Sequence, residues 1–105
     1  MSETSLSLNR YDGPARVGGI DFAEVRLVEH AGTEGGESRK VWEGTAEANR
    51  SEAPGISPEW ALKSGPLEVR LPHGAVGSAN IRSISLAYGD IWVVELLGVG
   101  PSPMA

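Results

Sequence analysis

Two histidines, His30 and His73, are the side chains whose chemistry is easiest to assign, because they alone titrate near neutral pH. Each follows a segment that we predict to be a strand, and neither belongs to a His-x-His or an i, i+4 pair. A metal site needs three or four converging ligands. We therefore expect structural or solvent-exposed histidines, with a ligand or a general base as the alternative, and we predict no metal and no cofactor.

The sequence lacks the patterns that would support nucleophilic or dinucleotide chemistry. It contains no cysteine, so thiolate nucleophiles, disulfides and sulfur-ligated zinc are excluded. No Gly-x-Ser-x-Gly elbow surrounds any serine. The sequence Gly98-Val99-Gly100 could begin a dinucleotide fingerprint, but that motif must open a helix, and Pro101 and Pro103 prevent one. We predict that the protein is not an enzyme.

Aromatic residues are the better candidates for a binding site, because they could line a concave site at the mouth of a β-barrel. His30 and Trp42 would lie at one end of the sheet, since the glycine-rich segment 31–38 joins them. The alternative is that the tryptophans fill the core of a small domain. Trp60 differs from the others, since it lies on an insert rather than on a strand. The candidate ligand-binding residues are His30, Trp42, Trp60, Tyr11 and His73.

Length and composition describe one globular domain. The chain has 105 residues, of which 40% are hydrophobic and 22% charged, which is enough for a single core. Its net charge is −5 and its seven arginines are scattered. No basic stripe is available to bind phosphates, so we predict no nucleic-acid partner. The sequence has no 18-residue apolar run and no signal-like N-terminal segment, so we expect a cytoplasmic protein without a membrane partner.

The N-terminal segment combines a polar stretch with turn chemistry. The polar composition of residues 1–9 predicts a flexible tail. Residues 10–15, RYDGPA, predict a structural turn that opens the domain, with Tyr11 as its anchor, because the Asp-Gly-Pro sequence is turn-forming. The single β domain then covers residues 10–105.

Period-2 alternation predicts strands over 22–28, 40–48 and 67–71. A Gly-Gly turn or bulge should precede the first of these strands. A mobile, glycine-rich loop, 31–38, should follow it. In the second strand, Trp42 and three small residues form the face that we assign to the core.

A break in this alternation, at 49–66, predicts the helical segment. Ser57 before Pro58 is a good N-cap with proline at the first helical position. We expect one short helical turn over 58–63, which would bury Trp60.

The C-terminal part predicts a hairpin, 78–98, that contains the most apolar strand. A change of phase near Ser83 predicts a β-bulge. The strand over 91–97 carries one charge, Glu95, so we expect both of its faces to be covered. Five to seven short strands with one helical turn favour an all-β fold, either a small antiparallel β-barrel or a sandwich.

Five short motifs occur in an informative order. They are YDGPA at 11–15, VRLVEH at 25–30, WEG at 42–44, LEVRLPHG at 67–74 and GVGPSP at 98–103. In this order the chain resembles an actinobacterial domain-of-unknown-function family, found alone or appended to flavin-dependent monooxygenases. The segments 31–39 and 49–66 depart from that family. The resemblance implies a fold and a context, and it implies no established activity.

The sequence therefore predicts a non-enzymatic binding or accessory module for an unidentified protein partner or small molecule. One alternative, implied by the resemblance, is an ancillary partner of a flavin-dependent monooxygenase. Another is a phage or mobile-element protein that binds and blocks a host factor, which an acidic, compact chain would suit. Because a second copy commonly covers the open sheet edges of a small domain, we expect a homodimer that contacts through the final strand and the Trp60 insert.

Overall fold

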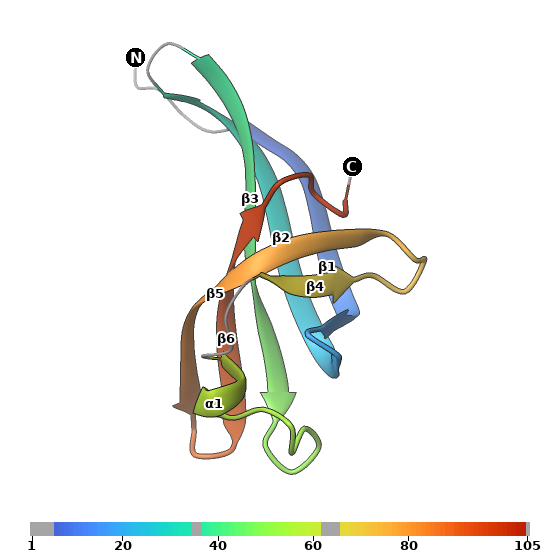
Figure 1. The fold of residues 1–105 in the computed structure, drawn as a ribbon, viewed down its shortest axis with the longest axis vertical. Coiled ribbons are helices and arrows are strands. Elements are labelled where there is room, and N and C mark those ends of the chain that lie inside the picture. The colour runs from blue at the N-terminus through green and yellow to red at the C-terminus, as the bar shows by residue number, and fades with distance from the viewer. Residues whose placement is uncertain (1–5, 35–36, 62–65, 105) are drawn as a thin grey trace.

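The chain folds into a closed antiparallel β-barrel with one helical turn (Figure 1). The computed structural model describes residues 6–34, 37–61 and 66–104. Within these residues the elements are β1 (Leu6–Val17), β2 (Ile20–Glu34), β3 (Glu37–Asn49), α1 (Pro58–Ala61), β4 (Leu67–Arg70), β5 (Val76–Ala87) and β6 (Ile91–Val99). The strands pair in the order β1-β2-β3-β6-β5-β4, and β4 closes the barrel against β1. The predicted all-β fold is confirmed.

A tight turn at Gly18 and Gly19 joins β1 to β2, as the sequence predicts. Their φ angles are +58° and +84°. Both values lie in the left-handed region, which glycine enters without steric cost. Two successive residues of this kind match the twist of an antiparallel hairpin, so the turn sets the register of the first two strands.

Two segments that we predict to be flexible belong partly to strands. β1 begins at Leu6, so residues 6–9 of the predicted tail are in the barrel, while residues 1–5 lie outside the described part. The β2–β3 ladder continues to the pair Glu34 and Glu37. The prediction of a loop over 31–38 is therefore wrong. The alternating residues near the barrel set the register of β2 against β3. The same register continues without a shift through the polar residues out to Glu34 and Glu37.

The RYDGPA segment lies inside β1 and is not an entry turn. Its turn chemistry marks a bulge instead, because the β1–β2 register shifts between Gly13 and Ala15. Tyr11 does act as a local anchor. Its hydroxyl donates a hydrogen bond to the carbonyl of Pro14, and its ring lies against Gly13. The irregular sequence therefore bends a strand, which is a usual effect of a bulge.

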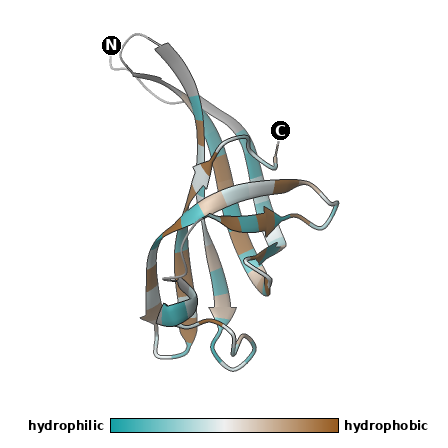
Figure 2. Cartoon of the chain, in the orientation of Figure 1, coloured by the Kyte–Doolittle hydropathy of each residue, from teal (hydrophilic) through white to brown (hydrophobic). Residues whose placement is uncertain are grey.

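Alternate side chains along the strands fill the interior, and hydrophobic and hydrophilic residues alternate accordingly (Figure 2). The predicted inner face of β3 is confirmed, with Trp42 2% and Ala46 0% exposed. Further side chains of this interior come from the other five strands: Val17, Phe22, Val25, Leu27, Val69, Ala79, Val94 and Leu96. Complete filling by side chains is typical of a small barrel.

The helical turn predicted near 58–63 is confirmed as α1, and it covers the lower end of the barrel in Figure 1. Residues 62–65 lie outside the described part. Trp60 is 8% exposed and packs against Phe22 with ring centroids 6.3 Å apart. The indole Nε1 of Trp60 also donates to the carbonyl of Gly18 at 3.4 Å. Trp60 is therefore a core residue that closes the barrel.

The C-terminal segment after β6 covers part of the interior farther up the barrel. Ser102 is 8% exposed and Pro103 is buried. Pro103 packs closely over Gly77. A Cβ added to Gly77 would lie 2.6 Å from Cδ of Pro103. Packed side chains fill the barrel interior between α1 and this C-terminal segment.

The final strand is covered on one face only. Val94 and Leu96 are 0% and 1% exposed, whereas Leu97 and Val99 are 44% and 40% exposed. The prediction that both faces are covered is therefore wrong. A closed barrel has a single interior, and no further layer of the described chain packs on the outside of β6.

Candidate functional site

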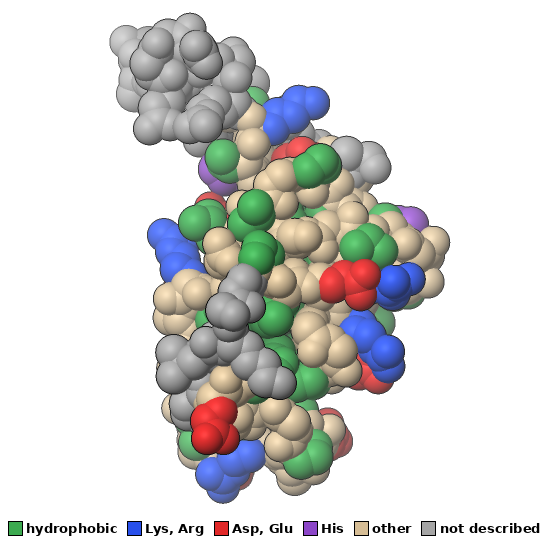
Figure 3. Space-filling view, in the orientation of Figure 1, with side chains coloured by type: hydrophobic (Ala, Val, Ile, Leu, Met, Phe, Trp, Pro, Cys, Tyr) green, Lys and Arg blue, Asp and Glu red, His purple; other side chains and the backbone are tan. Residues whose placement is uncertain are grey.

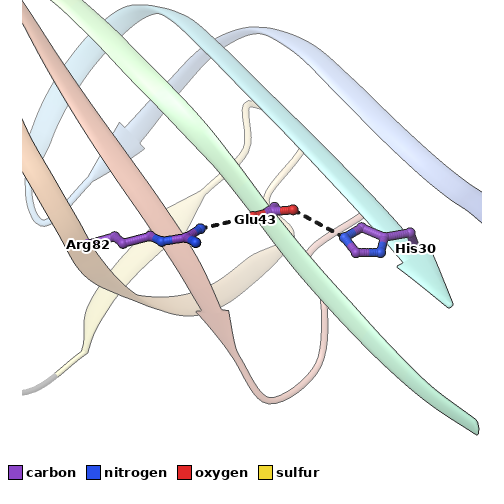
Figure 4. A network of polar contacts seen from close by, with 3 residues as sticks. All are labelled: His30, Glu43 and Arg82. Atoms are coloured by element: carbon purple, nitrogen blue, oxygen red, sulfur yellow. Dashed lines mark hydrogen bonds and ion pairs between the residues drawn. The ribbon is translucent and has the colours of Figure 1, made fainter. Parts of the chain in front are cut away.

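A polar network on the outer face of the barrel joins three strands (Figure 4). Nε2 of His30, on β2, lies 3.2 Å from Oε2 of Glu43, on β3. Nη1 of Arg82, on β5, donates to Oε1 of Glu43 at 3.1 Å. Each oxygen of the carboxylate therefore has its own partner. We call these three residues the outer network.

A bulge in β5 explains how Arg82 enters this network. Ile81 pairs with Leu96 and Ser83 pairs with Glu95, so Arg82 is an extra residue with no counterpart on β6. A bulge redirects the side chain of the inserted residue. The bulge that the sequence predicts near Ser83 is confirmed, and its structural effect is to let Arg82 reach past β6 to β3.

The outer network is partly exposed. Its side chains are 21% exposed for His30, 43% for Glu43 and 56% for Arg82. Because a carboxylate only accepts hydrogen bonds, Nε2 of His30 carries the proton that faces Glu43. Nδ1 is buried and has no hydrogen-bond partner among the described residues. A proton on Nδ1 would therefore be a buried donor without an acceptor there.

A hollow of about 370 Å³ adjoins the outer network. Its lining includes Glu43, Thr45, Arg82 and Glu95. The charges of both signs can contact polar groups of a partner. They do not form an obvious acid–base couple, because the carboxylate oxygens of Glu43 are already engaged by its neighbours.

Trp42 lies on the opposite face of the sheet from His30. His30 pairs with Val41 across β2 and β3. Successive residues of a strand point to opposite faces, so Trp42 points inward while His30 points outward. Trp42 Nε1 donates to the carbonyl of Gly100 at 3.2 Å. His30 and Trp42 therefore do not form one site, and Trp42 belongs to the core, which is the alternative that the sequence also allows.

The other three candidate residues lie apart from the outer network. Trp60, which lies on α1, is buried in the core, and Tyr11 is half-buried beside the β1 bulge. His73 is exposed in the turn between β4 and β5. Of the five residues that the sequence suggests, His30 alone joins Glu43 and Arg82, and the structure does not bring the five together.

Glu29 is a buried carboxylate that the sequence reasoning missed. It is 4% exposed, and Asn9 Nδ2 donates to its Oε1 at 2.6 Å. A register shift between Ser7 and Asn9 sets the amide opposite the carboxylate, which supplies the hydrogen bond that a buried acid requires. Glu29 is in phase with Val25 and Leu27, so extending the alternation along β2 would have placed it inside.

Within residues 6–34, 37–61 and 66–104, no group of three or more His, Cys, Asp or Glu side chains is arranged to hold a metal ion. The helix in that part of the chain is too short and too polar to cross a membrane.

No protein-family model, curated protein or solved structure matches the chain. The resemblance to an actinobacterial domain family therefore stays a prediction, and the function is argued from the geometry of the barrel.

Proposed function

We propose that the protein is a non-enzymatic binding module that forms a homodimer through the outer face of β3, β6 and β5. The observation that carries this proposal is a set of four large hydrophobic side chains on that face. Their exposed fractions are 42% for Val41, 45% for Val76, 44% for Leu97 and 40% for Val99. We call these four residues the outer patch.

The strand register brings the outer patch together. Leu97 pairs with Glu43 on β3, and Val99 pairs with Ser78 on β5. Val41 lies two residues before Glu43 and Val99 two residues after Leu97, so both side chains emerge on this face at the same end of the two antiparallel strands. Val76 lies two residues before Ser78, so its side chain emerges on the same face. Grouped exposed hydrophobic side chains of this kind mark interaction surfaces.

Charged groups of both signs border the outer patch, as a two-fold contact requires. The outer network supplies Glu43 and Arg82, and exposed Glu95 lies on the same face of β6. In a two-fold interface each copy presents the same surface, so Arg82 of one copy can approach a carboxylate of the other. An apolar centre with a polar rim is the usual anatomy of an interface.

The overall charge of the chain does not prevent such a contact. The net charge is −5, but acidic and basic side chains are dispersed over the side of the molecule seen in Figure 3. Exposed charges separated by more than about 8 Å are screened at physiological ionic strength. On the contact face itself Glu43 and Glu95 lie near Arg82, so two copies do not face a surface of a single sign.

The basis for the dimer differs from the one that the sequence suggests. Barrel closure pairs β1 with both β2 and β4, which removes the fully open edge that a flat sheet would have. Trp60 is 8% exposed and is not available for contact. Of the two contact surfaces expected from the sequence, the exposed face of the final strand is the one that supports the proposal.

Light scattering after size-exclusion chromatography tests the proposal. The wild-type protein should have about twice the 11.0 kDa mass of one chain. Leu97→Glu places a charge at the centre of the outer patch and should give a folded monomer. Leu86→Glu is the matched control, since Leu86 is also exposed, at 38%, but lies outside the patch. A wild-type monomer at high protein concentration would reject the dimer.

A further inference from the structure

The seam between β1 and β4 is short, and two prolines explain why. The two strands pair at Arg16 with Arg70 and at Val17 with Val69. Two residues beyond this pair, Pro14 lies at the β1 bulge and Pro72 lies in the turn after β4, and both prolines border the same opening. Neither proline has an N–H group, so the ladder cannot extend through them. The barrel wall therefore opens immediately beyond the two arginines.

A cleft of about 340 Å³ occupies this opening. Phe22 and Leu71 contribute to its lining, although they are only 1% and 2% exposed. Pro14 and Pro72 provide further apolar surface. This volume lies at the lower end of the range for small-molecule sites, about 300–1,000 Å³. The cleft can therefore take a small ligand with an apolar body.

Two guanidinium groups border the same cleft. Arg16 and Arg70 are directly opposite each other on neighbouring strands, and their side chains are 54% and 51% exposed. Two like charges in this position repel each other. A ligand that places an anion between them would relieve that repulsion.

Each arginine is held by one acid and keeps most of its donors. Asp21 accepts from Nε and Nη2 of Arg16 at 3.0 and 3.4 Å. Glu68 accepts from Nη2 of Arg70 at 3.1 Å. A guanidinium has five N–H donors, so these ion pairs orient the two groups and leave donors free for a ligand.

We infer that this cleft binds a small organic monocarboxylate whose body is aromatic or aliphatic. The carboxylate lies between Arg16 and Arg70, which suit its planar geometry, and the apolar body lies against Phe22, Leu71 and the prolines. Asp21 and Glu68 each pair with one of the two arginines, so the ligand carboxylate is bound by the N–H donors that these ion pairs leave free. The inference rests on the proposed role as a binding module and names the ligand class.

Phenylacetate is a suitable probe, because it joins one carboxylate to one aromatic ring. Titration of the full ¹⁵N-labelled chain, followed by amide NMR shifts, should show saturable changes centred on 15–16, 21–22 and 70–71. The uncharged analogue 2-phenylethanol and inorganic phosphate should each bind at least about tenfold more weakly, because each lacks one of the two recognised features. Equal binding of either compound would overturn the inference.

Arg70→Gln tests the contribution of the guanidinium. It should weaken phenylacetate binding about tenfold or more, while Arg70→Lys should give a smaller loss. Arg50→Gln is the matched control and should bind as the wild type does, since Arg50 is also exposed and paired, with Asp90, but lies outside the cleft. Circular dichroism checks that each variant is folded.

Unchanged binding by Arg70→Gln, or no saturable shift with the wild type, would reject the cleft as a carboxylate site. Light scattering of the same samples reports on the dimer separately. A monomer that binds phenylacetate would contradict the homodimer alone, and a dimer that does not bind it would contradict the ligand site alone.

Discussion

The indole of Trp42 lies directly over the backbone of Gly98. A Cβ placed on Gly98 would be 2.2 Å from Cε2 and 2.3 Å from Nε1 of Trp42. The largest side chain of the core is therefore accommodated because its neighbour on β6 has none. The hydrogen bond from Trp42 to the carbonyl of Gly100 holds the indole against this strand.

Gly98→Ala should destabilise the fold strongly. The added methyl group must displace the indole or the strand, and overpacking of this kind costs about 1–3 kcal/mol, occasionally more. Urea unfolding measures the loss. Gly55→Ala is the control, because its Cβ would meet only the tip of Ile20, at 3.3 Å, and should change stability by less than about 0.5 kcal/mol. Equal midpoints for the two variants would show that the indole can move aside.

Val94→Asp should prevent stable folding. Val94 is 0% exposed inside the barrel, and an unpaired carboxylate buried there costs several kcal/mol, a large part of the roughly 5–15 kcal/mol that stabilises a typical domain. Leu97→Asp changes the exposed face of the same strand and should remain folded. Circular dichroism and the soluble yield compare the two variants. A soluble, folded Val94→Asp protein would show that this face of β6 is accessible to water.

The sequence predicts the strands and their inward-facing residues better than it predicts what covers the outer face of each strand. Period-2 alternation places Trp42 inside and predicts the bulge near Ser83 correctly, because both depend on residues close together in the chain. It fails for Leu97, since alternation does not reveal whether the outside of an apolar strand is covered. That property depends on how many layers the fold has.

The sites are harder to predict, because they depend on pairing between distant strands. Glu43 and Arg82 are 39 residues apart and meet only through a bulge beside β6. The cleft similarly requires the β1–β4 register, which sets Pro14 near Pro72. The sequence places His30 and Trp42 at one end of the sheet, but it does not reveal that their side chains lie on opposite faces.

The ion pair between Arg16 and Asp21 should make stability depend on acid pH. The hydrogen bond and the charge of Arg16 lower the pKa of Asp21 below its ordinary value. A lowered pKa means that the folded state binds this proton less readily than the unfolded state. The ion pair therefore stabilises the fold above the ordinary pKa of aspartate, about 4, and this contribution disappears as the pH falls through the lowered pKa.

An NMR titration of the Asp21 carboxyl group tests this expectation. Its midpoint should lie below the ordinary value for aspartate, and Arg16→Gln should raise it toward that value. The thermal stability of Asp21→Asn should fall less with acidification than that of the wild type. An ordinary titration midpoint for Asp21 in the wild type would show that the ion pair does not persist in solution.

The last prediction concerns His30. His30→Ala should leave the fold intact, because a partly exposed hydrogen bond such as the one between His30 and Glu43 contributes about 0.5–1.5 kcal/mol. Removing a ring whose Nδ1 is buried without a described partner also offsets part of that loss. Glu43 then keeps only Arg82, so its position at the rim of the outer patch becomes less defined, and self-association should weaken severalfold.

Thermal unfolding and the dilution dependence of the mass measure the two effects separately. His73→Ala is the control for the melting temperature, which it should not change, since His73 is exposed in the turn between β4 and β5. A clear fall in melting temperature with unchanged association would show instead that His30 serves the fold and that the contact surface lies elsewhere.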